Sequence, residues 1–192
     1  HPDSLAFAWL FHGWNHGFRR DWAMCLKSVD AGMSVASEGD SVQTLAWNRC
    51  VRGWAVAHIG RVTEGIEELT TGIECSRRIM GQVAIPQFSV MMAEILLLQD
   101  DVDGALRWLS QALELSNRQF DRYFDAELHR LSAVCLLSRG HREAARTRLC
   151  NALDVAYAQD AATFALRAGL TLAKYDLEDW QNVLASALRT YP

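Results

Sequence analysis

The chain has 192 residues, a formal net charge of −4, 50% hydrophobic residues and only three prolines. Acidic and basic side chains are mixed along the whole sequence, so no basic stripe marks a nucleic-acid interface. No apolar run reaches the roughly 18 residues that a membrane-spanning helix needs, which argues against a membrane protein.

The composition predicts helices throughout, because helix formers dominate and β-branched residues are scattered singly. Glycine suits a helix C-terminus and aspartate an N-cap, so Gly60, the acidic cluster at 100–103 and Gly140 predict turns inside hairpins. Pro86 fits the first turn of a helix. In chain order the sequence predicts ten helices, at about 3–18, 21–38, 41–59, 62–80, 84–99, 102–118, 122–139, 141–158, 161–175 and 177–190.

Small residues recur with a period of 40 residues. Three series carry the pattern: Gly13, Gly53, Ala93, Ala133 and Ala173; Cys25, Gly65, Ala105, Ala145 and Ala185; and Gly32, Gly72, Ala112 and Ala152. Small residues at these positions let the two helices of a hairpin approach closely. The pattern predicts a single all-α repeat domain over 1–192, with five stacked hairpins at about 3–38, 41–80, 84–118, 122–158 and 161–190.

The spacing of these small residues resembles the tetratricopeptide repeat, and Ala133, Gly140, Ala145, Leu149 and Ala152 show it best. A period of 40 residues instead of about 34 implies longer helices, hence a variant repeat. The resemblance implies a right-handed α-α superhelix, or solenoid, with a concave inner surface. The last hairpin is degenerate, because Arg189 stands where the other hairpins have an aliphatic residue.

The sequence also resembles a family of large multidomain proteins over most of its length. The segments 125–131, 142–145, 152–156 and 164–168 resemble the C-terminal repeat region of bacterial multidomain signalling proteins. Those proteins join a class III adenylate/guanylate cyclase domain, or a DNA-binding domain, to a predicted ATPase and then to helical repeats. The resemblance implies a fragment of a longer protein, with ATPase or cyclase activity in other domains, because the chain itself has no P-loop.

The first helix of each hairpin lines the concave groove in tetratricopeptide arrays. The resemblance therefore predicts these groove residues: Phe7, Trp14, Trp47, Trp54, Glu94, Glu127, Arg130, Arg167 and Lys174. Aromatic and arginine side chains are enriched at interface hot spots, so the groove is expected to dock a peptide or helix. The alternative is that the tryptophans fill the core between hairpins.

Two polar patterns favour structural roles. His12 and His16 lie one turn apart but lack a third ligand for zinc. Glu127 and Arg130 have the spacing of an ion pair on a helix, which fits them and the intervening His129 better than acid–base catalysis does. We therefore predict no catalytic residue, no metal and no cofactor in this chain.

The first functional hypothesis is a non-catalytic regulatory module that binds a protein or peptide, including the ATPase or cyclase domains of its own protein. The second is a small-molecule sensor whose tryptophan-rich end encloses an inducer, and a stand-alone enzyme is a weak third. Stacking of exposed ends would give a homodimer. Five cysteines without a CxxC pair suit reduced thiols in the cytoplasm.

Overall fold

The computed structural model describes residues 1–119, 122–177 and 180–190, and the described residues are helical apart from short turns. All ten predicted helices are present, and their ends fall within three residues of the predicted ones. The helices are α1 (Pro2–Phe18), α2 (Trp22–Glu38), α3 (Val42–His58), α4 (Val62–Met80), α5 (Ile85–Leu98), α6 (Val102–Gln119), α7 (Asp125–Ser138), α8 (Arg142–Ala158), α9 (Ala162–Lys174) and α10 (Trp180–Thr190).

Left-handed residues end these helices at regular intervals. Positive φ values recur about every twenty residues, at Arg20, Asp40, Gly60, Gly81, Asp100, Gly140 and Asp160. Glycine and aspartate are among the residues that best tolerate this conformation, which stops a helix and reverses the chain. Asp100 therefore ends α5, while Asp101 caps α6 by accepting a hydrogen bond from the Gly104 amide at 2.8 Å.

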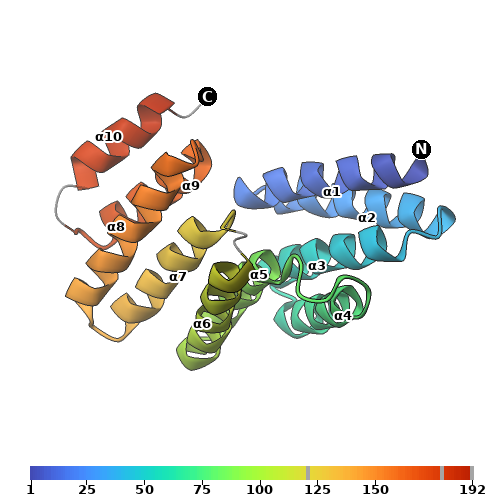
Figure 1. Cartoon of the computed structure of the whole chain (residues 1–192), viewed down its shortest axis with the longest axis horizontal. Helices are drawn as coiled ribbons and strands as arrows, with labels where there is room; N and C mark the ends of the chain where they lie inside the picture. Colours follow the sequence, from blue (N-terminus) through green and yellow to red (C-terminus); the bar gives the residue numbers. More distant parts are fainter. Residues whose placement is uncertain (120–121, 178–179, 191–192) are drawn as a thin grey trace. The chain divides into compact units, whose positions relative to one another are not determined.

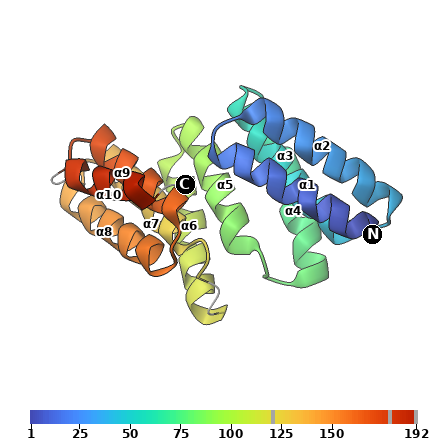
Figure 2. The same cartoon turned by 90° about the horizontal axis from the view of Figure 1, so that it is seen from above.

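The chain divides into two compact units, His1–Gln99 and Asp100–Pro192, and each is described by itself. Within each unit, every helix contacts the next one in the sequence (Figures 1 and 2). In the first unit α1 also contacts α3, and α3 contacts α5; in the second, α7 contacts α9. No such contact joins α2 to α4, or α6 to α8, among the described residues.

The odd-numbered helices therefore form one layer in each unit, which we call the odd-helix layer: α1, α3 and α5 in the first unit, α7 and α9 in the second. The even-numbered helices lie on the other side. The all-α class and the stacking of helices in sequence order are confirmed, whereas the right-handed superhelical path stays a prediction.

In the first unit, small residues of the 40-residue period lie where helices meet: Gly13, Gly53, Gly65 and Gly72 face the other helix of their own hairpin, and Gly32 faces α3 of the next hairpin. A Cβ atom added to Gly53 in α3 would lie 2.6 Å from the carbonyl oxygen of Gly65 in α4. Twelve of the fourteen small residues are buried. The exceptions, Ala173 and Ala185, belong to the last hairpin, where Gly169 meets Leu184 and Ala187 is buried instead.

Candidate functional site

Residues at equivalent positions of neighbouring hairpins meet along the odd-helix layer. Trp54 and Glu94 stand 40 residues apart, and the indole Nε1 donates a hydrogen bond to the carboxylate at 2.9 Å. Glu127 and Arg167 are also 40 residues apart and form an ion pair at 3.0 Å. Many predicted groove positions thus contact their own counterparts in the next hairpin.

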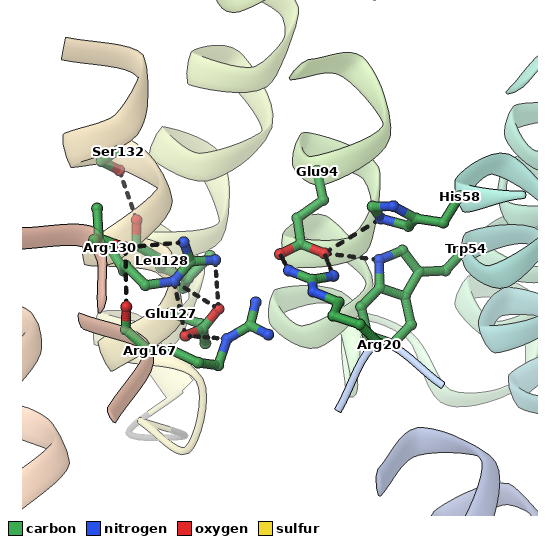
Figure 3. Close-up of polar contacts among 10 residues, drawn as sticks. Arg20, Trp54, His58, Glu94, Glu127, Leu128, Arg130, Ser132 and Arg167 are labelled. Carbon is green, nitrogen blue, oxygen red and sulfur yellow. Dashed lines mark hydrogen bonds and ion pairs between the residues drawn. The ribbon is translucent and has the colours of Figure 1, made fainter. Parts of the chain in front are cut away.

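The first polar cluster surrounds Glu94 of α5, whose side chain is only 5% exposed. Arg20, in the turn after α1, binds both carboxylate oxygens, with distances of 2.9 Å from Nη1 and 2.8 Å from Nη2 (Figure 3). Trp54 donates its indole hydrogen bond from α3. His58, one turn later in α3, places Nε2 at 3.6 Å from Glu94 Oε2, within ion-pair range when the imidazole is protonated. One carboxylate therefore joins parts of three hairpins.

Aromatic rings enclose the guanidinium of this cluster. The Arg20 guanidinium carbon lies 5.4 Å from the Trp22 ring centroid and 5.9 Å from that of Trp54. Trp22 stacks on His58, with centroids 4.2 Å apart and ring planes 5° from parallel. Cation–π contacts of this kind strengthen when water is excluded, so the rings hold Arg20 over the buried carboxylate.

The second polar cluster surrounds Glu127 of α7, which is fully buried. Arg130, one turn later, donates from Nε at 3.0 and 3.1 Å and from Nη2 at 2.9 Å (Figure 3). Arg167 of α9 donates from Nε at 3.0 Å. Thr171 Oγ1 accepts from Arg130 Nη1 at 3.5 Å, and it donates to the carbonyl oxygen of Arg167 at 2.9 Å.

Electrostatics keep Glu127 ionised. Burial alone raises the pKa of this carboxyl, but the charges and hydrogen bonds of Arg130 and Arg167 outweigh it, so the pKa lies below the ordinary 4.5. Burial and the neighbouring Arg148 lower the pKa of His129, whose Nδ1 lies 3.2 Å from the Arg148 guanidinium. His129 therefore accepts a hydrogen bond from α8 and does not touch the Glu127 carboxylate in any described contact.

The predicted aromatic end of the groove is mostly buried. Trp14, Trp47 and Trp54 are 6%, 8% and 0% exposed, so their rings belong to the core of the first unit. Trp47 also donates from Nε1 to Ser76 Oγ in α4 at 3.0 Å. Phe7 contacts the Trp47 ring at a centroid distance of 5.9 Å, yet it remains 38% exposed.

Within each unit the structure thus brings predicted groove residues into contact with one another, and it leaves Lys174 apart. Lys174, at the end of α9, is exposed and lies 5.4 Å from the Tyr175 ring centroid. Three members of the Glu94 cluster escaped prediction: Arg20, Trp22 and His58. Only His58 had a sequence signal, because it follows Trp54 by four residues and so shares its helix face.

The two histidines of α1 lie next to each other, with ring centroids 4.6 Å apart, and each has a different polar partner. His12 Nδ1 lies 2.8 Å from Ser28 Oγ, and His16 Nδ1 lies 3.0 Å from Asp21 Oδ2. Within the part of the chain that the structure describes, no group of three or more His, Cys, Asp or Glu side chains is placed to hold a metal ion. In the same residues, no helix is both long enough and apolar enough to cross a membrane.

The sequence is similar to that of a distant bacterial relative. No family model matches the sequence. The chain is 27% identical over 153 residues to an uncharacterized protein of Rhizobium meliloti (strain 1021). The aligned stretch covers 79% of this chain and 15% of that protein, so the chain corresponds to a small part of its relative.

Proposed function

We propose that this chain is a non-catalytic, regulatory repeat module of a bacterial signalling protein, and that it binds a peptide or a partner domain along the odd-helix layer. The partner includes, on this proposal, the ATPase or cyclase domain of the same protein. Likeness to the repeat arms of cyclase- and ATPase-type regulators motivates the proposal. The match to a small part of a much longer bacterial protein supports one point of the proposal, namely that the chain is a module of a longer protein.

The observation that carries the proposal is the presence of buried charge on the odd-helix layer. A buried ion pair is often no more stabilising than hydrophobic residues of similar volume. Apolar residues in place of Glu94 and Glu127 and their partners would therefore be expected to give comparable stability. Packing alone therefore does not explain them. Glu94 fixes the position of Arg20, whose side chain is 42% exposed, and a charge fixed in this way is suited to selecting a partner by charge as well as by shape.

Selection of peptides from a random displayed library against the chain tests this proposal. Lys174→Glu and Phe7→Ala change exposed residues of the odd-helix layer, one in each unit. Lys27→Glu and Ile79→Ala are matched controls, because both residues are exposed and lie on even-numbered helices. We expect selected peptides to lose at least about tenfold in affinity, or 1.4 kcal/mol, with one of the layer variants. Equal binding to the layer and control variants would refute the proposal.

The second candidate is a small-molecule sensor, and the observation that favours it is the group of aromatic side chains around the Arg20 guanidinium, next to the Glu94 carboxylate. Trp22, Trp54 and His58 form this group, in which each aromatic side chain contacts the other two. A small cation held there would have to displace Arg20. Thermal-shift screening with small organic cations, on the unaltered chain and on Arg20→Met, separates this candidate from peptide binding.

A further inference from the structure

One face of α1 is exposed at positions that the other odd-numbered helices bury. Its exposed residues are Ser4, Leu5, Ala8, Phe11, His12 and Asn15. At the position of Ala8, the next four odd-numbered helices have Asn48, Phe88, Leu128 and Ala168, each 0% exposed. At the position of Phe11 they have Val51, Met91, Leu131 and Thr171, which are at most 7% exposed. Leu5 and Phe11 are 51% and 43% exposed.

The preceding even-numbered helix covers this face wherever it is buried. Contacts join α2 to α3, α4 to α5, α6 to α7 and α8 to α9. A Cβ atom added to Gly32 of α2 would lie 2.4 Å from Asn48 Oδ1 in α3. Likewise, Ser116 of α6 donates a hydrogen bond to the Asp125 carboxylate in α7. A contact between an even-numbered helix and the odd-numbered helix that follows it therefore occurs four times among the described residues.

The covering helices share one chemical feature. Each has two small, buried residues four positions apart: Gly32 and Ala36, Gly72 and Ser76, Ala112 and Ser116, and Ala152 and Ala156. Residues four apart lie on one helix face, and small side chains there allow a close approach of the next helix. In α2 and α6 such residues contact the next helix, through Gly32 and Ser116. In α4 the printed contacts of Gly72 and Ser76 are with α3 of the same hairpin. The covering helices are thus alike in being amphipathic with small buried residues, which in two of them lie against the next helix.

We propose that the exposed face of α1 docks an amphipathic helix of this kind, supplied by polypeptide outside residues 1–192. Leu5, Ala8 and Phe11 provide the apolar contact, and Ser4, His12 and Asn15 border it. The docked helix extends the established series of interfaces by one more. None of these residues is a predicted groove residue, although the Phe11 ring lies 5.0 Å from that of Phe7 and 5.6 Å from that of Trp14 between centroids. The test below involves no peptide binding, so the inference stands or falls independently of the peptide-binding proposal.

A grafted helix tests the docking face directly. A copy of residues 142–161, which comprise α8 and the turn after it, is inserted before Pro2 of the full chain. The copy is chosen because α8 packs on α9, where Ala168 is the counterpart of Ala8 and Ala162 that of Pro2. We expect the graft to slow amide hydrogen exchange in α1 by about tenfold or more, since a helix packed on this face opens less often.

Two controls make the outcome decisive. A graft whose copy carries Ala152→Arg and Ala156→Arg should give no protection, and neither should the intact graft on a chain with Ala8→Arg. Absence of protection with the intact graft, or equal protection with the arginine-bearing one, overturns the proposal. The proposal is also overturned if α1 of the unaltered chain becomes protected as the protein concentration rises and sedimentation shows dimers. A second copy of the chain would then cover this face.

Discussion

Removing the Arg20 side-chain charge should destabilise the first unit, because Glu94 depends on it. Arg20→Met removes two charge-assisted hydrogen bonds of 2.8 and 2.9 Å while keeping a stem to cover the tryptophan rings. Loss of one partner from a buried ion pair costs about 3–5 kcal/mol. Arg20 itself is 42% exposed, so water already screens the pair, and a cost of about 2 kcal/mol is expected.

Urea denaturation followed by tryptophan fluorescence measures this cost, since five of the seven tryptophans lie in residues 1–99. Arg19→Met is the matched control: Arg19 is the exposed neighbour, and its loss should change stability by less than about 0.5 kcal/mol. A double-mutant cycle with Glu94→Gln should give a coupling energy of about 1–2 kcal/mol. Equal effects of Arg20→Met and Arg19→Met would show that the cluster contributes no stability.

Three further predictions concern pH, packing and capping. Because the pKa of Glu127 is lowered on folding, its stabilising contribution is present above pH 4.5 and is lost as the pH falls through the folded-state pKa. Glu127→Gln should therefore lower the free energy of unfolding at pH 7 and make stability fall less steeply at acid pH. An unchanged fall of stability at acid pH would contradict this. Gly53→Ala should destabilise the chain by about 1–3 kcal/mol, because the added Cβ would meet Leu69 N at 2.6 Å. Gly169→Ala should stabilise it by up to about 1 kcal/mol, because the added Cβ has no contact under 3.5 Å. Thermal unfolding of both variants measures the difference, and the reverse order of stability would refute the packing argument. Asp101→Ala should destabilise the chain by about 1 kcal/mol, because it removes the N-cap of α6. Asp103→Ala is the control and should cost less than about 0.5 kcal/mol, because the Asp103 side chain is exposed. Equal unfolding midpoints of the two variants in urea would contradict the capping role.

The helices were predictable from sequence because their boundaries depend on local chemistry. Gly60 and Gly140 adopt the left-handed conformation that ends a helix, and Pro86 lies in the first turn of α5. The start of α7 was predicted less accurately, because the residues before it form a turn that no glycine or proline marks. Helix α7 begins three residues later than predicted, since Asp125 donates its amide to the Arg122 carbonyl and its carboxylate accepts from the Arg122 side chain.

The candidate site was predictable only in part. The 40-residue period places Trp54 and Glu94, or Glu127 and Arg167, at equivalent positions, so their helix face followed from the sequence. Their burial did not, because it depends on how closely adjacent odd-numbered helices pack. Arg20 was missed because it belongs to a turn, and no residue pattern indicates that its side chain reaches α5.

The most direct test of the central claim is the hydrogen-exchange footprint of a peptide selected against this chain. Binding along the odd-helix layer predicts slower exchange on α1, α3 and α5, or on α7 and α9, with the even-numbered helices unchanged. Protection confined to α2, α4, α6, α8 or α10 would place the peptide on the opposite side of the hairpins and contradict the account.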